Sequence, residues 1–150
     1  MERYFVGIDN GGTNIKAAVF SSSGLQMSAA SEQTPVTVVR EGYHERDMIF
    51  LWEKTTAAIQ KAISASGIAP EKIAAVGCTC HGKGLYLWGK DGKPCAPAIA
   101  STDQRAAELV REWEQNGTTA QAGLLNLQST LACQPEAESA GGISEHSMGV

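Results

Sequence analysis

The sequence has no cluster of lysine and arginine and no long apolar run, and each absence removes a class of protein. Its net charge is −4 over 150 residues, with acidic and basic residues interspersed, which argues against a nucleic-acid-binding surface. No apolar stretch approaches the roughly 20 residues that a membrane-spanning helix requires. The opening residues MERYFVGIDN lack the apolar core of a signal peptide. These absences predict a cytoplasmic protein without a nucleic-acid or membrane partner.

The sequence contains four cysteines. The four present are expected to be reduced thiols rather than a disulfide framework, because the chain shows no sign of secretion: Cys78, Cys80, Cys95 and Cys133. Apolar residues make up 43% of the sequence, which is ordinary for a globular domain. A chain of this length can form one domain with a hydrophobic core.

Short apolar runs separated by turn residues predict that the chain opens with an antiparallel meander. Residues 3–9 (RYFVGID) and 14–20 (NIKAAVF) are expected to be strands. The turn between them, NGGT, contains Asn and Gly, which tolerate positive φ. Residues 25–36 follow as a weaker third strand, and residues 35–46 are expected to form a loop.

A helix is predicted over residues 48–66, where apolar residues recur at helical spacing. Asp47 is a suitable N-cap, and Gly67 fits the position after the helix end. The apolar run over residues 72–80 (KIAAVGCTC) has the composition of a strand buried on both faces.

Beyond this strand, we expect a strand and a hairpin turn over residues 85–93, and an extended segment over residues 95–100. A second helix is expected over residues 104–115, with Asp103 as its cap. These elements predict an α/β fold, in which a mixed sheet has an antiparallel N-terminal meander and flanking helices.

Residues 77–84 (GCTCHGKG) admit several interpretations. Gly77, Gly82 and Lys83 nearly match the phosphate-binding P-loop pattern. However, Gly84 stands where that pattern requires a Ser or Thr for Mg²⁺, and a strand is expected to follow instead of a helix. The match to a P-loop is therefore taken as accidental.

A metal site is the second interpretation of this segment. Cys78, Cys80 and His81 lie close in sequence, but they lack the spacing of structural zinc sites. On a strand the two cysteines would share one face while His81 would point away. Burial as small packing residues is the simpler explanation for the cysteines.

A polar substrate site at the end of a strand is the third interpretation. Glycines let the backbone approach a ligand, while His81 and Lys83 supply hydrogen-bond donors. Asp103 and Arg105, about twenty residues later, supply an acceptor and a donor. This combination suits a small polyhydroxylated or acidic ligand.

The segment GIDNGGTNIKAAVF (7–20) predicts a phosphate site at the end of the first strand. Successive amides of a tight glycine turn form an anion-binding concavity, and Gly11, Gly12 and Thr13 provide that turn with an added hydroxyl. Asp9 could hold the waters of a Mg²⁺ ion, which takes few carboxylates. Lys16 is near enough to screen charge. A plain hairpin with a convenient turn is the alternative.

Residues 7–20 resemble the first phosphate motif of the sugar kinase, actin and Hsp70 superfamily, which implies a ribonuclease H-like fold. Residues 77–106 resemble the carbohydrate kinases of the FGGY family, and are nearest to its xylulose kinase and L-xylulose kinase members. The resemblance extends over residues 3–134. It implies transfer of the ATP γ-phosphate to a primary hydroxyl of a ketopentose, with Mg²⁺ as the cofactor.

Residue roles follow from the same resemblance. Asp9 would contact Mg²⁺ through water, while the turn of Gly11, Gly12 and Thr13, with Lys16 beside it, would face the ATP phosphates.

In the sugar pocket, His81 and Gly82 would match the His-Gly pair of xylulose kinases, with Lys83 next to them. Asp103 and Arg105 would match the positions that bind sugar hydroxyls.

FGGY kinases are much longer than this chain, so the resemblance implies that the general-base Asp lies beyond residue 150. We expect an incomplete first domain over residues 1–133 and an atypical, disordered tail over residues 134–150. The truncated chain is expected to have little activity alone and an uncovered sheet edge that favours self-association. The alternative is a non-catalytic sugar- or phosphate-binding fragment or a pseudogene product.

Overall fold

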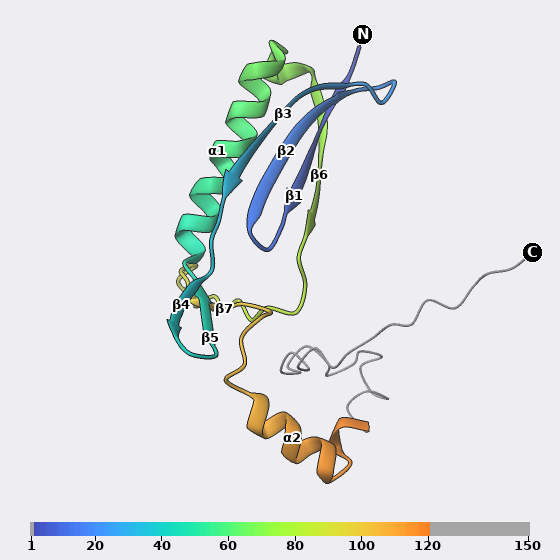
Figure 1. Cartoon of the computed structure of the whole chain (residues 1–150). Coiled ribbons are helices and arrows are strands. Elements are labelled where there is room, and N and C mark those ends of the chain that lie inside the picture. The colour runs from blue at the N-terminus through green and yellow to red at the C-terminus, as the bar shows by residue number, and fades with distance from the viewer. Residues whose placement is uncertain (1, 121–150) are drawn as a thin grey trace, which may run out of the picture. The chain divides into compact units, whose positions relative to one another are not determined.

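The computed structural model describes residues 2–120, which fall into two compact units (Figure 1). The first unit ends at Asp103 and contains two sheets and helix α1 (Met48–Ser66). The second begins at Gln104 and contains helix α2 (Ala107–Gln115). The expected domain boundary near residue 133 and the expected tail lie outside the described residues.

A four-stranded mixed sheet forms the centre of the first unit. Its strands are β1 (Tyr4–Asn10), β2 (Asn14–Ser21), β3 (Gln26–Gln33) and β6 (Ile73–Cys80), in the order β3-β2-β1-β6. β1, β2 and β3 pair antiparallel, and β6 runs parallel to β1. The predicted meander and the mixed sheet are both confirmed.

The core of this unit lies between the sheet and α1, which covers one face of the sheet in Figure 1. Alternate residues of β1 and β2 point toward the helix, as the twofold periodicity of a strand requires. Val6 is 2% exposed, and Ile15 and Val19 are fully buried. The buried cluster consists of Tyr4, Val6, Ile8, Ile15, Ala17, Val19, Ala58 and Ala62.

Both ends of α1 follow the prediction. Asp47 is the N-cap, and its Oδ1 accepts hydrogen bonds from the amides of Ile49 at 2.8 Å and Phe50 at 3.0 Å. These bonds satisfy two of the amides that have no partner inside the helix. Gly67 ends the helix with a φ of 66°, a conformation that costs glycine little.

A second, three-stranded sheet occupies the region where a loop was expected. β4 (Thr37–Arg40) and β5 (Tyr43–Arg46) form a hairpin, and β5 also pairs with β7 (Ala98–Ile99). The prediction of a loop over residues 35–46 is wrong. These strands are short, and β5 is paired with a partner some fifty residues later, which local sequence does not reveal.

The segment after β6 is less regular than predicted. The described strand ends at Cys80, and only isolated bridges join Leu85 to Ile99 and Trp88 to Pro94. The expected hairpin turn is present, because the amide of Gly89 donates to the carbonyl of Lys93 at 2.7 Å. A short 3₁₀ helix, η1 (Pro70–Lys72), leads into β6.

In the second unit, α2 begins at Ala107, and Ala106 occupies its N-cap position without a side-chain hydrogen bond. The prediction that Asp103 caps this helix is therefore wrong. The carboxylate of Asp103 instead accepts a hydrogen bond from the amide of His44 at 2.7 Å.

Within residues 2–120, no helix combines the length and apolarity needed to cross a membrane.

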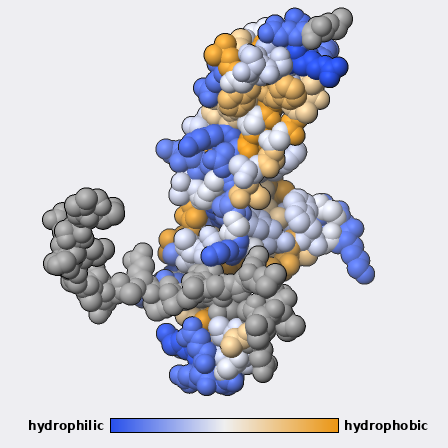
Figure 2. Space-filling model, turned by 90° about the vertical axis from the view of Figure 1, so that its right-hand side faces the viewer, coloured by the Kyte–Doolittle hydropathy of each residue, from blue (hydrophilic) through white to orange (hydrophobic). Residues whose placement is uncertain are grey.

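β6 was expected to be buried on both faces, and this prediction is wrong. α1 packs against β2 and β3, so it leaves β6 uncovered, and Val76 is 60% exposed. Figure 2 views the molecule from the side on which β6 lies in Figure 1 and shows apolar surface, in orange, within its upper half. The apolar composition of β6 thus lies at the surface of the described chain.

Glu32 provides a test of how the meander is joined to the helix. From β3 it binds two lysines of α1, Lys61 and Lys54, the latter at 3.0 Å. Hydrogen bonds from Lys61 and then Lys54 hold the pKa of Glu32 below its ordinary value of 4.5. Because the folded-state pKa is lowered, the stabilisation is complete above the unfolded-state pKa and is lost as the pH falls through the folded-state value.

We expect Glu32→Gln to lower the free energy of unfolding at pH 7 and to have a smaller effect at pH 3, closer to the lowered folded-state pKa of Glu32. Urea denaturation at low salt at both pH values measures this difference. A penalty of equal size at the two pH values would show that the ion pairs do not stabilise the fold.

Candidate functional site

The candidate site lies at the carboxyl ends of β1 and β6. Asn10, the last residue of β1, is in register with Cys80, the last residue of β6. Two segments therefore leave the sheet side by side, at the carboxyl ends of these strands: the Gly turn, defined as Gly11–Thr13, and the loop that begins at His81. The carboxyl ends of neighbouring parallel strands are where open α/β sheets bind ligands.

The two glycines of the Gly turn are present for different reasons. Neither has a left-handed φ, so the expectation that the turn uses positive φ at these glycines is wrong. A Cβ on Gly11 would lie 2.8 Å from the carbonyl oxygen of Asn14, which already accepts the amide of Gly11 at 3.0 Å. A Cβ on Gly12 would meet nothing within 4 Å. The fold excludes a side chain at Gly11 and leaves the space beside Gly12 open.

A chain of buried contacts holds the Gly turn in place. The carbonyl of Thr13 accepts the amide of Thr34 at 2.8 Å. The carbonyl of Thr34 in turn accepts Nη2 of Arg46 at 3.0 Å, and Arg46 is only 2% exposed. The hydroxyl of Thr13 lies 3.3 Å from the side-chain amide of Asn14, which donates to it. The hydroxyl oxygen therefore acts as the acceptor there, and its own proton is left to donate elsewhere.

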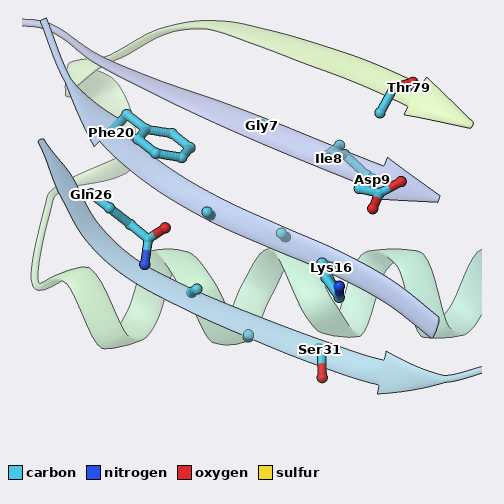
Figure 3. Close-up of a pocket in the computed structure, with 12 residues that line it drawn as sticks. Gly7, Ile8, Asp9, Lys16, Phe20, Gln26, Ser31 and Thr79 are labelled. Atoms are coloured by element: carbon cyan, nitrogen blue, oxygen red, sulfur yellow. The ribbon is translucent and has the colours of Figure 1, made fainter. Parts of the chain in front are cut away.

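Asp9 and Lys16 lie on the face of the sheet opposite α1, where Figure 3 shows them on neighbouring strands together with Thr79. Asp9 pairs with Lys16 on β2 and with Thr79 on β6. This face of the sheet lines a shallow pocket of about 540 Å³. Its lining includes all three side chains and a floor of small residues: Gly7, Ala17, Ala18, Ala29 and Ala30.

The donor set around Asp9 fits a hydrated Mg²⁺ ion better than a metal held by protein groups alone. Among residues 2–120, no three His, Cys, Asp or Glu side chains converge to hold a metal. Asp9 is exposed and has the hydroxyl-bearing Thr79 beside it on β6. Mg²⁺ keeps several of its waters and commonly takes one or two carboxylates together with substrate phosphates.

A second concavity, here called the His81 pocket, lies at the end of β1 and β6 and has a volume of about 270 Å³. It is lined by Asn10, Leu51, Cys80, His81, Gly82, Lys83, Gly84 and Tyr86. The carbonyl of Asn10 accepts the amide of His81 at 3.1 Å and lies 3.0 Å from its Nδ1. The other ring nitrogen, Nε2, lies 2.6 Å from the hydroxyl oxygen of Tyr86.

The backbone around Lys83 is tightly constrained. Lys83 has a φ of 68°, which is unusual for a residue with a side chain. A Cβ on Gly84 would lie 2.6 Å from Cε2 of Tyr86 and 3.1 Å from the carbonyl oxygen of Ile99. The Ser or Thr of a P-loop has no room at this position, and no helix occurs over residues 81–97. The structure therefore contradicts a P-loop here.

The cysteines near this pocket are not packing residues. Cys78 and Cys80 lie two residues apart on β6 and share one face, as predicted. Both are exposed free thiols, as is Cys95, so the prediction of burial is wrong. The cause is the uncovered position of β6.

Three of the five predicted sugar-site residues line one pocket: His81, Gly82 and Lys83. Asp103 is 5% exposed and belongs to the same unit, but it is outside the pocket lining, and Arg105 belongs to the second unit.

Sequence reasoning missed Asn10, Leu51 and Tyr86 as lining residues. Tyr86 stands between two leucines in a segment that was expected to be a strand, so nothing marked it as a site residue.

Known proteins resemble this chain in sequence and in fold. The model of the N-terminal domain of the FGGY family of carbohydrate kinases matches residues 4–134. A probable L-xylulose kinase of Haemophilus influenzae is 46% identical over 112 residues, which cover 75% of this chain and 23% of that protein. The L-xylulose/3-keto-L-gulonate kinase of Escherichia coli is 37% identical over 119 residues, or 78% of this chain and 24% of that protein.

The fold has a counterpart of known structure in the ligand-bound xylulose kinase of Lactobacillus acidophilus. The TM-score is 0.75 and the identity 22%, over 81% of this chain and 24% of that one. The α/β fold of the sugar kinases is thereby confirmed, and the chain spans about a quarter of the length of the proteins it matches. The family match covers most of the sequence, and the chain therefore belongs to the FGGY family of carbohydrate kinases.

Proposed function

We propose that this chain supplies the phosphate-binding turn and part of the sugar pocket of an ATP-dependent kinase that phosphorylates a primary hydroxyl of a ketopentose. The proposal rests on one observation: β1 and β6 end side by side, so the Gly turn lies beside the His81 pocket. Two relatives named for L-xylulose kinase activity support a ketopentose as the acceptor.

The phosphate side of the reaction would use the Gly turn. The amides of Gly12 and Thr13 and the hydroxyl of Thr13 would donate hydrogen bonds to phosphate oxygens, and the open space beside Gly12 lets those oxygens approach. Asp9 would hold the waters of Mg²⁺, and Lys16, its partner across the strands, would offset phosphate charge. A bound Mg²⁺ ion supplies neutralisation of the charge that develops on the transferred phosphoryl group.

The sugar side would use His81, Gly82 and Lys83, which line the His81 pocket. Gly82 has open space where a side chain would stand, so its backbone can approach a ligand. Asp103 and Arg105 enter the proposal through the family resemblance. Asp103 already accepts the amide of His44, so it would act on the sugar while holding β5 in place.

The general base is expected beyond residue 150, and we propose that this chain has little activity alone. Positioning of both substrates dominates phosphoryl transfer, and the loss of a general base costs about 10²- to 10⁴-fold. We further propose that the protein acts in the cytoplasm.

The second candidate function is that of a non-catalytic fragment that retains sugar or phosphate binding. The formed pocket and Gly turn within a chain of this length favour it.

The two glycines of the Gly turn test the phosphate site, because one serves the fold and the other faces open space. We expect Gly12→Ala to weaken Mg²⁺–ATP binding about tenfold or more through lost hydrogen bonds to phosphate. It should alter stability by less than about 0.5 kcal/mol. Gly11→Ala should instead cost about 1–3 kcal/mol of stability, because its Cβ meets the carbonyl of Asn14.

Amide NMR titration with Mg²⁺–ATP detects weak binding, and urea denaturation gives the stability of both variants. If Gly12→Ala binds Mg²⁺–ATP as tightly as the wild type, phosphate does not approach this turn.

A panel of ketopentoses tests the acceptor and the activity of the chain. Calorimetry should find one ketopentose that binds, and coupled assays of ATP turnover should find almost no phosphoryl transfer. Turnover that Asp9→Ala abolishes would establish a complete enzyme and refute the proposal of low activity. Failure of every ketopentose to bind would refute the sugar pocket.

The exposed edge of β6 leads us to expect self-association through a second copy of this chain. Within residues 2–120, β6 has a neighbouring strand on one side only, and its unpaired backbone groups can template another strand. Sedimentation should show a dimer or larger species whose population rises with concentration. Lys in place of Val76, which is 60% exposed, should shift the population toward monomer with little change in folding. A chain that stays monomeric at every concentration would contradict this expectation.

A further inference from the structure

We propose that the hydroxyl of Tyr86, which the imidazole of His81 orients, accepts a hydrogen bond from a polyhydroxylated ligand in the His81 pocket. The inference rests on the proposed function, because it assigns the recognition of one ligand hydroxyl within the proposed sugar site. Tyr86 lines the pocket, and neither its position in the sequence nor the family resemblance had marked it.

Both ring nitrogens of His81 are already engaged within the chain. Nδ1 lies 3.0 Å from the carbonyl oxygen of Asn10, and a carbonyl can only accept a hydrogen bond. Nδ1 therefore carries the proton. In the neutral ring Nε2 is then an acceptor, and the Tyr86 hydroxyl, 2.6 Å away, donates to it. A ligand could reach a nitrogen of this ring only by displacing Tyr86 or Asn10.

This arrangement defines what the pocket offers to a ligand. A tyrosine hydroxyl has one proton to donate, and here the proton is directed to His81. The oxygen lone pairs that remain can accept one hydrogen bond from a ligand. The chemical class that fits is an alcohol whose O–H donates, as the hydroxyls of a neutral sugar do.

The Tyr86 ring is held in position before any ligand binds. Its edge lies where a Cβ on Gly84 would stand, since that Cβ would be 2.6 Å from Cε2 of Tyr86. The rings of His81 and Tyr86 meet edge to face, with centroids 6.0 Å apart and planes at 63°. Gly84 thus leaves room for the Tyr86 ring, His81 orients its hydroxyl, and Asn10 orients His81.

The test removes only the hydroxyl. Tyr86→Phe keeps the ring, and Tyr4→Phe is the matched control, because Tyr4 lies at the opposite end of β1 from Asn10, roughly 20 Å away at about 3.3 Å per residue. Calorimetry measures the affinity for the ketopentose that the wild type binds most tightly. Analogues in which each hydroxyl in turn is replaced by hydrogen show which hydroxyl is recognised.

We expect Tyr86→Phe to bind the ketopentose about three- to tenfold more weakly, as the loss of one neutral hydrogen bond predicts. Tyr4→Phe should bind it like the wild type. For one deoxy analogue, the wild type and Tyr86→Phe should bind equally, because the hydroxyl that contacts Tyr86 is missing. Thermal melting and the ¹⁵N shifts of His81, with Nδ1 still protonated, check that the Tyr86→Phe pocket is intact.

Two outcomes would overturn this inference while leaving the proposed function in place. Equal binding of the ketopentose by Tyr86→Phe and the wild type would show that the hydroxyl is not used. An equal loss for every analogue would show that Tyr86 only supports the pocket. If the wild type binds no ketopentose, the proposed sugar site fails and this assignment fails with it.

Discussion

The candidate site depends on the backbone carbonyl of Asn10. This oxygen accepts two hydrogen bonds from His81, one from its amide at 3.1 Å and one from its ring at 3.0 Å. Asn10 is also the last residue of β1, directly before the Gly turn. One acceptor therefore ties the proposed phosphate site to the proposed sugar pocket. A change that moved the end of β1 would move both sites together.

The remainder of the first unit holds that carbonyl in place. Pairing of β1 with β2 on one side and with β6 on the other fixes the register, and α1 covers the apolar face of β1 and β2. The glycines around the site fall into two pairs, one that the fold requires and one that leaves space for a ligand. Gly11 and Gly84 have no space for a side chain, whereas Gly12 and Gly82 face open space. The second pair is where a bound molecule would approach the backbone.

The elements predicted correctly from the sequence are those that local sequence signals determine. Helix α1, with its Asp47 cap and Gly67 end, and the β1–β2–β3 meander follow from periodicity, caps and turns. The pairing of β5 with β7 was missed because it joins distant segments. For the site, His81, Gly82 and Lys83 were predicted, but Tyr86 was not. Its hydrogen bond to His81 forms in a loop whose fold places the Tyr86 ring against Gly84, and local sequence does not reveal that contact.

The central claim is that two ligands bind side by side at the ends of β1 and β6. A ¹⁵N amide NMR titration, first with a ketopentose and then with Mg²⁺–ATP, tests it most directly. The sugar should shift amides over residues 80–86, and the nucleotide should shift those of Gly11, Gly12 and Thr13. Asn10 and His81 should respond to both ligands, because the Asn10 carbonyl joins the two sites. Shifts confined to other parts of the chain, or no shifts with either ligand, would contradict the account.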